Sequence, residues 1–560
     1  MSKTVVVTSL ALLAAAALLP AGATAEWLAA GNAERVDALR SGVQTLRVAL
    51  AALGALLLAL ERFAPRTGTF EPLVASGLHE PRRPSGRSLA AIGALLVIAL
   101  GLRLPALGVG LSFDEIDTLV HYARLPLARV VTTFDSQNQH LLYSVLARIS
   151  FVAFGESAWA VRLPAVLLGV ASVFAMYRFA RRVASEREAL FAAALLAVSH
   201  HHVWFSQNAR GYTGLLLYTL LGSEAFLRLL SAREPRGIGA LVEYGLWMAL
   251  ATLTHATAVF AVAAHGLVAL GALVASRPRA VGPNRTRPLL ALVLAGAISF
   301  ALHALVLPQF VATLLAPTMP GAQTEWKDPL WLVTETLSGL ARGIPGGFVT
   351  LALGSAVALL GVVSYARQSL AALGTFLLGT LITIAALLAT KHNLWPRMFF
   401  FSAGFFVLIA VRGVVEAAGL LRRWLDPARI STFAGAGLAA TCLASLWTVP
   451  GAWRPKQDFE GARAFVETSR APGDAVATVD MTVMPYADFY TAPWTPVDNV
   501  EALQALESAH ARTWVVYSTP TRMRAAQPQI WEHLQLHYRV AETFWGTLGG
   551  SEIVVAVRER

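Results

Sequence analysis

Charged residues are scarce in this sequence, and cysteine is almost absent. Asp, Glu, Lys and Arg make up 14% of the 560 residues, whereas 56% are hydrophobic. Because a soluble domain has about 25% charged residues, most of this chain is expected to lie in lipid. The one cysteine, Cys442, lies in an apolar run, which excludes an intrachain disulfide and leaves a metal–thiolate site without its other ligands.

A basic surface for nucleic acid is not indicated either, although the net charge is +11. The arginines fall in short clusters between apolar runs, as the positive-inside rule expects of cytoplasmic loops. If the spans alternate in direction, every cluster lies on one face, and loops 108–160 and 308–346 and the tail after residue 450 lie outside. The clusters are Arg62, Arg66, Arg82, Arg83 and Arg87; Arg178, Arg181, Arg182 and Arg187; Arg228, Arg233 and Arg236; Arg277, Arg279, Arg285 and Arg287; and Arg422, Arg423 and Arg429.

The apolar runs predict a polytopic bundle of α-helices with about 13 spans. The runs from residue 89 onward each have roughly 17–22 residues, which is enough to cross a bilayer. The first, Thr4 to Pro20, precedes Ala23-Thr24-Ala25 and is interpreted either as a signal peptide or as an uncleaved span. The others are Leu46–Leu60, 89–107, 161–181, 188–205, 211–230, 238–256, 259–276, 289–307, 347–365, 369–390, 398–418 and 430–449.

Three parts of the chain are predicted. Residues 1–88 form an N-terminal extension with the signal-like segment and one further span, and residues 89–450 form the main transmembrane domain. The tail 451–560 contains turn signals, a helical stretch and short β-type runs, so it is predicted to be a small α/β domain outside the membrane. The helical stretch is Phe459–Thr468, and the β-type runs are Ala475–Val479, Thr513–Tyr517 and Ser551–Val557.

Two adjacent acids, Asp114 and Glu115, follow the run 89–107 in a loop predicted to lie outside. A solvated helix N-terminus would explain such a pair without any function. However, ionisable groups at the membrane are costly and tend to line functional cavities. The apolar residues that flank both acids therefore make them candidates for chemistry.

Outward cations are the second signal, because the positive-inside rule would place them on the other face. Arg210 lies at a span boundary, Lys391 and Arg397 lie between two later spans, and His255 and His392 are on the same side. Such groups act either as anchors for anionic headgroups or as a clamp for a phosphate, whose oxygens match the guanidinium fork.

Several motifs of this part of the chain occur together in one known family. They are Phe113-Asp114-Glu115; His140 and Tyr143; Gly155-Glu156-Ser157 with Trp159; Val161-Arg162-Leu163-Pro164 with Gly169; and Ser206-Gln207-Asn208-Ala209-Arg210-Gly211-Tyr212. Over about residues 89–260 the chain resembles the C-type glycosyltransferases of family 39. These include bacterial protein O-mannosyltransferase-like enzymes and the lipid A aminoarabinose transferase.

The resemblance implies a C-type glycosyltransferase fold and transfer on the outer face of a bacterial cell (inner) membrane. The donor is a polyprenyl-phosphate sugar, and a hydroxyl of a lipid, glycan or protein attacks the anomeric carbon with inversion. Asp114 is then the general base, with Glu115 beside it, and cations stabilise the departing phosphate. Candidates for substrate binding are His140, Tyr143, Arg162, Arg210, Tyr212, His255, Lys391, His392 and Arg397.

The chain departs from the family at two places. Its Gln139-His140-Leu141-Leu142-Tyr143 lacks the prolines of the family's His-Pro-Pro-Leu-Tyr loop, and Met398 stands where tyrosine is usual. These differences affect the identity of the donor and acceptor more than the reaction class.

No metal ligands are assigned from the sequence. Some family members bind a divalent metal near the acidic pair. The run His200-His201-His202 also invites a metal site. Successive residues of a helix do not share a face, so packing is the preferred interpretation of the three histidines.

Two other functions remain open at this stage. A transporter or lipid flippase would also need many spans, but it would concentrate its charges near the bilayer midplane and show paired broken helices. An inactive family member that binds polyprenyl lipid would differ from an enzyme only in an activity assay.

Overall fold

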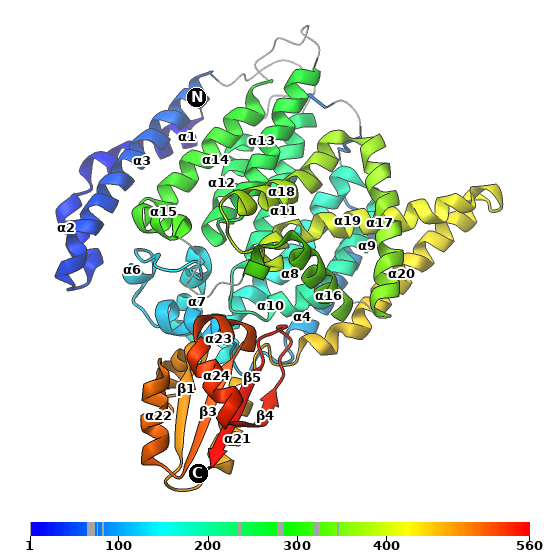
Figure 1. Ribbon diagram of the computed structural model, residues 1–560. Coiled ribbons are helices and arrows are strands. Elements are labelled where there is room, and N and C mark those ends of the chain that lie inside the picture. Colours follow the sequence, from blue (N-terminus) through cyan, green and yellow to red (C-terminus); the bar gives the residue numbers. More distant parts are fainter. Residues whose placement is uncertain are drawn as a thin grey trace.

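The computed structural model describes residues 2–63, 73–74, 77–80, 83–231, 237–276, 285–316, 324–343 and 346–559. It consists of a large helical bundle with a small α/β domain at one end (Figure 1). The fold class predicted from the sequence is therefore confirmed. Of the arginines in the predicted cytoplasmic clusters, Arg66, Arg82, Arg233, Arg236, Arg277 and Arg279 lie outside the described residues.

Twenty α-helices and several short helical turns precede the α/β domain in the described part. The helices are α1 (Lys3–Leu18), α2 (Ala21–Ala29), α3 (Val36–Phe63), α4 (Gly86–Arg103), α5 (Phe113–Thr118), α6 (Leu127–Val130), α7 (Leu141–Phe154), α8 (Ala158–Val183), α9 (Glu186–Ala197), α10 (His200–Ser206), α11 (Tyr212–Ser231), α12 (Gly239–Thr254), α13 (Ala258–Ala275), α14 (Arg287–His303), α15 (Leu307–Leu315), α16 (Pro329–Arg342), α17 (Gly347–Gln368), α18 (Leu370–Ala389), α19 (Ala403–Gly419) and α20 (Pro427–Ala452). The 3₁₀ turn η4 (Pro396–Ser402) leads into α19.

The described residues contain nine helices long and apolar enough to cross a membrane, or up to 12 spans if three bent helix pairs each count as one. All 13 predicted spans coincide with helices, and α12, with 16 residues, is the one that is not counted among the 12. The three bent pairs are α1 with α2, α9 with α10, and α14 with α15, at 84°, 58° and 101°.

A buried arginine stabilises the bend between α9 and α10. Arg103, at the end of α4, is fully buried and donates from Nη1 to the carbonyl of Ala197, the last residue of α9, at 3.1 Å. Its Nη2 lies 2.6 Å from His202 Nδ1 in α10. The carbonyls at the end of a helix lack intrahelical partners, so the guanidinium satisfies a group that the bend exposes.

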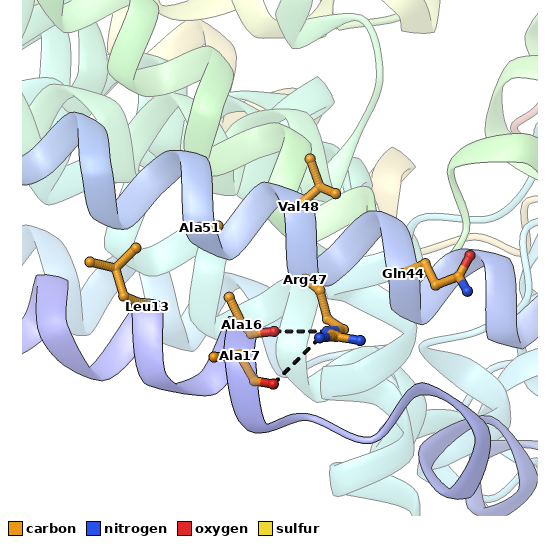
Figure 2. A pocket seen from close by; sticks show the side chains of 7 residues that line it. All are labelled: Leu13, Ala16, Ala17, Gln44, Arg47, Val48 and Ala51. Atoms are coloured by element: carbon orange, nitrogen blue, oxygen red, sulfur yellow. Dashed lines mark hydrogen bonds between the residues drawn. The ribbon is translucent and has the colours of Figure 1, made fainter.

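The N-terminal helices form a flank of the bundle (Figure 1). Helix α1 packs along α3, and Arg47 of α3 donates to the carbonyls of Ala16 and Ala17 in the last turn of α1, at 2.8 and 3.4 Å (Figure 2). This contact caps α1 and lines a pocket between the two helices. The lining residues of the pocket belong to α1 and α3 and do not include the acidic pair.

The α/β domain contains a five-stranded mixed sheet in the order β2-β1-β3-β5-β4. Strand β1 pairs in parallel with β2 and β3, and β5 pairs antiparallel with β3 and β4. The strands are β1 (Ala475–Val479), β2 (Thr495–Val497), β3 (Arg512–Ser518), β4 (Arg539–Phe544) and β5 (Ile553–Glu559), and the helices are α21 (Phe459–Ser469), α22 (Val500–Ala509), α23 (Pro520–Ala526) and α24 (Pro528–His537). The predicted β-type runs and the predicted helix are confirmed.

One face of this sheet shares its core with the bundle. Val476, Trp514 and Val555 belong to the same buried cluster as Leu111 and Ile116, which flank and form α5. The end of the bundle that contacts the α/β domain, called the domain end below, therefore includes α5. Arg162 and the pair Arg181 and Arg182 lie at opposite ends of α8, so this arginine cluster is remote from the domain end.

Helices α17 and α19 cross at two glycines. A Cβ atom at Gly361 would overlap the carbonyl of Ile409, and one at Gly413 would overlap the carbonyl of Val357. Small residues let membrane helices approach backbone to backbone. The crossing therefore requires the absence of a side chain at both positions.

We expect Gly361→Val to lower the thermal unfolding midpoint of the detergent-solubilised protein, because the added side chain has no space against the α19 backbone. Overpacking of this kind costs about 1–3 kcal/mol. Gly354→Val in the same helix is the matched control, since nothing lies within 4 Å of a Cβ there. Equal midpoints for the two variants would show that the helices do not cross in this way.

Candidate functional site

The acidic pair lies in the first turn of α5, where a capping box fixes the helix start. Ser112 is the N-cap, and its backbone N and its Oγ donate to Glu115 Oε2 at 3.0 and 2.9 Å. The two acidic side chains then diverge. Glu115 is fully buried, whereas the side chain of Asp114 is 25% exposed.

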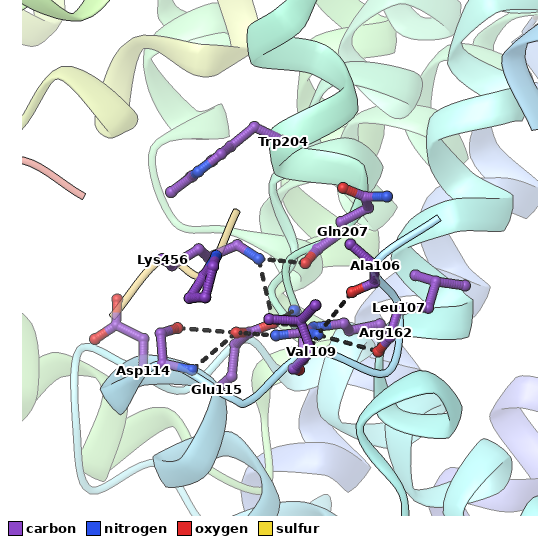
Figure 3. A network of polar contacts seen from close by, with 12 residues as sticks. Ala106, Leu107, Val109, Asp114, Glu115, Arg162, Trp204, Gln207 and Lys456 are labelled. Atoms are coloured by element: carbon purple, nitrogen blue, oxygen red, sulfur yellow. Dashed lines mark hydrogen bonds and ion pairs between the residues drawn. The ribbon is translucent and has the colours of Figure 1, made fainter. Parts of the chain in front are cut away.

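Glu115 is at the centre of a buried polar network (Figure 3). Arg162 of α8 donates to both carboxylate oxygens at 2.7 Å, and the backbone N of Ala209 donates to Oε1 at 2.9 Å. Lys456 Nζ lies 3.8 Å from the same oxygen. With the two bonds from Ser112, five donors surround a carboxylate that offers about four lone-pair sites. Within the described contacts this carboxylate therefore has no free acceptor position.

The charges around Glu115 decide its protonation. Burial alone would raise the pKa of this carboxyl group, but Arg162 and Lys456 outweigh burial and hold the pKa well below its usual range. Arg162 also donates from Nη1 to the carbonyls of Leu107 and Val109, at 3.0 and 2.6 Å. The ion pair thus joins α5, α8 and the end of the loop that follows α4.

Asp114 faces two guanidinium groups instead. Its Oδ2 accepts from Arg397 Nη1 at 2.8 Å and lies 3.9 Å from Arg210 Nη1. Burial would raise the pKa of Asp114, but these two cations outweigh it, so the pKa lies below its ordinary value. In Figure 3 no dashed line reaches Asp114, whose carboxylate points away from the Glu115 network.

Arg210 is nearly buried, with 3% of its side chain exposed, and its Nε and Nη1 have no hydrogen-bond partner in the described part of the chain. Buried polar atoms are normally paired. A guanidinium with two unpaired nitrogens beside an accessible carboxylate is a place where an anionic oxygen would be stabilised. Arg397 lies over the ring of Trp395 at 5.1 Å, which fixes the second guanidinium.

Two neutral histidines form the wall behind Arg210. His140 Nδ1 accepts from the backbone N of Gly211 at 2.8 Å, and its Nε2 lies 3.2 Å from Arg210 Nη2. The rings of His140 and His255 are 4.6 Å apart, and Tyr212 lies edge-on to His140. Burial, together with the charge of Arg210, lowers the pKa of His255 to about 3 and that of His140 well below its usual value.

Glycine is required at position 211 of this wall. A Cβ atom there would lie 2.7 Å from the carbonyl oxygen of Thr254 and 3.0 Å from His140 Nδ1. The close approach brings the start of α11 against the end of α12 and so places Arg210 beside His140.

The structure therefore brings together six of the predicted site residues: Asp114, His140, Arg210, Tyr212, His255 and Arg397. Tyr143 and Arg162 lie in the buried interior, where Tyr143 donates to the carbonyl of Val161 at 2.6 Å. Lys391 is exposed, and His392 Nδ1 contacts Thr390 Oγ1 at 2.9 Å. Neither has a contact with Asp114 among the described interactions.

The donor set does not fit a divalent cation. Asp114 faces two arginines, and Glu115 is surrounded by donors. The described residues contain no group of three or more His, Cys, Asp or Glu side chains suited to a metal. A ring nitrogen of each histidine in the run has a hydrogen-bond partner within the protein. The partners are the carbonyl of Thr448 for His200, the carbonyl of Gly339 for His201, and Arg103 for His202.

Sequence reasoning missed Lys456 and Gln457, which contact α5 directly. Both are buried and follow the last span. One signal was present: like Lys391, Lys456 is a lysine on the predicted outer side, where the positive-inside rule disfavours cations.

We expect Glu115→Gln to lower the thermal unfolding midpoint strongly, because it leaves Arg162 and Lys456 without a counter-charge. Removing one partner of a buried ion pair costs about 3–5 kcal/mol. Glu156→Gln is the matched control, because the Arg124–Glu156 pair has side chains 30% and 40% exposed and such pairs contribute about 0–1 kcal/mol. A Glu115→Gln protein as stable as this control would contradict the central place of Glu115.

Comparison with known proteins supports the resemblance drawn from the motifs. Residues 138–315 match the family model of dolichyl-phosphate-mannose-protein mannosyltransferases. The matched segment contains His140, Arg210 and His255, whereas Asp114 and Arg397 lie outside it. No curated protein matches the chain.

Solved membrane glycosyltransferases are similar at low identity. Archaeoglobus fulgidus oligosaccharyltransferase AglB, in complex with an inhibitory peptide and a dolichol-phosphate, is 13% identical over 84% of this chain and 74% of its own, with a TM-score of 0.47. ArnT from Cupriavidus metallidurans, bound to undecaprenyl phosphate, is 14% identical over 84% of this chain and 98% of its own, with a TM-score of 0.45. The S. cerevisiae Pmt1–Pmt2 complex is 17% identical over 41% of this chain and 34% of that chain, with a TM-score of 0.34.

The resemblance to the family 39 glycosyltransferases predicted from the motifs is thus confirmed by the match over residues 138–315.

Proposed function

We propose that this chain is a membrane glycosyltransferase that moves a sugar from a polyprenyl-phosphate donor to an acceptor hydroxyl at the domain end of the bundle. Asp114 is the general base, and the configuration of the sugar inverts. The observation that carries the proposal is the pairing of a partly exposed carboxylate with two guanidinium groups, one of which has two unpaired nitrogens.

Arg210 and Arg397 form the phosphate site of this proposal. The donor's phosphate leaves with increasing negative charge, and preorganised cations stabilise that charge in the transition state. Guanidinium groups match phosphate oxygens with two parallel hydrogen bonds. The unpaired Nε and Nη1 of Arg210 point to different sides of the guanidinium, and each can donate to a phosphate oxygen without breaking an existing hydrogen bond.

Binding of the donor would also release the base. Without donor, the two arginines hold the pKa of Asp114 below its ordinary value, which weakens it as a proton acceptor. A phosphate that takes over Arg397 and Arg210 removes part of their pull on the carboxylate, and its own negative charge raises the pKa of Asp114 further. The carboxylate is then free to accept the acceptor's proton only when a donor is present.

His140, His255 and Tyr212 have a supporting role in this scheme. Both histidines stay neutral through the physiological range, so they add no charge that would compete with Arg210 for the phosphate. Their rings and Tyr212 enclose the guanidinium and exclude water from one side. We assign Glu115, Tyr143 and Arg162 to holding this arrangement in place and not to contact with substrate.

The domain end is proposed to face the outside of a bacterial cell membrane. The arginines at the end of α8, including Arg181 and Arg182, lie at the opposite end of that helix from Arg162, and arginine clusters mark the cytoplasmic side. A donor that has been flipped across the membrane would then meet an acceptor lipid, glycan or protein at Asp114.

Asp114→Asn should abolish transfer while the protein still inserts and folds, because an amide cannot accept the acceptor's proton. The measurement is mass spectrometry of envelope glycans from a deletion strain that expresses each variant. Asp37→Asn, at a residue whose side chain is 94% exposed, is the control and should restore the missing sugar. Full restoration by Asp114→Asn would refute the proposed function.

Arg210→Gln should weaken the binding of undecaprenyl phosphate to the purified protein, measured by quenching of tryptophan fluorescence. Loss of a charge-assisted hydrogen bond costs about 1.5–3 kcal/mol, or roughly 10–100-fold in affinity. Arg124→Gln should bind as the wild type does, since Arg124 pairs with Glu156 at an exposed position. Asp114→Asn should bind at least as tightly, because it removes a negative charge from the phosphate site. Unchanged affinity in Arg210→Gln would rule out this phosphate site.

A further inference from the structure

The segment that joins the last membrane helix to the α/β domain lies against the helix that carries Asp114. It spans residues 453–458, between α20 and α21, and Pro455, Lys456 and Gln457 lie in its middle. We propose that Lys456 and Gln457 are positioning residues that hold α5, so that the α/β domain is an integral part of the active centre. The inference rests on the proposed function and deepens it.

Gln457 holds the first residue of α5. Its Oε1 accepts from the backbone N of Phe113 at 2.9 Å, and its Nε2 donates to the carbonyl of Ser551 at 3.4 Å. The first N–H groups of a helix have no partner within the helix. A buried side chain from the linker satisfies one of them, next to Asp114, and ties it to the segment that precedes β5.

Lys456 holds the other side of the same turn. The residue is 5% exposed, and its ammonium group donates to the carbonyl of Gln207 and lies 3.8 Å from Glu115 Oε1. Its Nζ is also 5.4 Å from the ring centroid of Trp204. Gln207 begins the loop that carries Arg210, so one side chain touches both segments that form the proposed site (Figure 3).

The linker itself is fixed to the α/β domain. The backbone N of Thr547 donates to the carbonyl of Pro455 at 2.9 Å, and that of Leu548 to the carbonyl of Lys456 at 3.1 Å. A side chain at Gly546 would overlap the Lys456 carbonyl. The position of Lys456 and Gln457 is therefore set by residues 546–551 of the domain.

Helix α5 depends on such contacts because it is short. Its six residues continue directly into the π-helical turn Leu119–Ala123, and even this combined helix is short, since isolated helices shorter than about 12 residues are marginal in water. Outside contacts must fix its direction, and the direction sets the distance from Asp114 to Arg397. A displacement of about 1 Å at a reacting group can cost about 100-fold in rate.

Sugar transfer should also depend on pH through the charge of Lys456. Burial lowers the pKa of Lys456 to about 7, although Glu115 opposes this and Arg162 adds to it. The charged groups that face it are Glu115 of α5 and Arg162 of α8, while Gln207 and Trp204 are neutral. Lys456 is thus charged below about pH 7 and loses its attraction to Glu115 above it.

A rise in pH is expected to have opposite effects on the stability of the protein and on the positioning of α5 by Lys456. A lysine whose pKa is lowered by folding makes the native state more stable as pH rises from about 7 towards 10.5. Transfer is expected to fall over the alkaline range while the contribution of Lys456 to the unfolding midpoint does not. A residue that merely stabilised the fold would not separate these two quantities.

The test compares Lys456→Met and Gln457→Leu with Arg454→Met in the full-length protein. Arg454 is exposed, lies two residues before Lys456, and makes no described hydrogen bond or ion pair. Hydrogen–deuterium exchange of peptides covering residues 111–118 should be faster in the first two variants and unchanged in the third. Sugar transfer in the complemented strain should fall about 10-fold or more. The affinity for undecaprenyl phosphate should change less than the transfer.

Lys456→Arg serves as the conservative rescue. It restores a permanent charge, so transfer should recover and lose its decline above about pH 7. If Lys456→Met fails to fold, the exchange and transfer of Gln457→Leu test the same proposal independently.

Two results separate the inference from the proposed function. If Asp114→Asn is inactive while Lys456→Met and Gln457→Leu show wild-type transfer and wild-type exchange in residues 111–118, the inference is overturned and the proposed function stands. If Asp114→Asn is fully active, the proposed function fails, and exchange in the linker variants still decides whether the linker holds α5.

Discussion

The ion pair between Glu115 and Arg162 is the contact on which the geometry of the site depends. It is fully desolvated, with side chains 0% and 2% exposed. Such a pair is costly to bury unless its remaining lone pairs and protons are satisfied. Leu107, Val109 and Ser112 of the loop between α4 and α5 satisfy them, together with Ala209 of the loop before α11. Satisfying one buried charge pair therefore fixes α5, α8 and the loop before α11 relative to one another.

The α/β domain enters the site through this same pair. Lys456 adds a second cation to Glu115, and the buried cluster around Ile116 continues into the sheet at Trp514 and Val555. A tethered accessory domain would meet the bundle through a polar, hydrated surface. Here the two share a hydrophobic core, so a change in the domain's position would be transmitted to α5.

The sequence predicts the bundle, most of its spans and the α/β domain, because hydrophobic runs and alternating strands are local patterns. It also predicts that Asp114 and Arg210 belong to the functional site. The resemblance assigns the base to Asp114, but the sequence does not show that Glu115 is the buried acid, since successive helix residues point about 100° apart and only the surrounding segments show which side is buried. Lys456, 341 residues after Glu115 in the chain, reaches it only through the fold. The bend between α9 and α10 was missed for the same reason: its partner, Arg103, comes from another helix.

Asp114 and Glu115 have different roles because different groups balance their charges. Glu115 accepts hydrogen bonds from Ser112, Arg162 and Ala209, and Arg162 keeps its pKa well below its usual range. Among the described residues, the carboxylate of Asp114 faces two guanidinium groups, one of them incompletely bonded, and part of its surface is open. An anion that binds those guanidinium groups weakens their hold on Asp114 and changes its basicity, whereas Glu115 is unaffected because its partners face inward. Glu115 therefore holds the surrounding segments in place, while the basicity of the neighbouring Asp114 changes when the substrate binds.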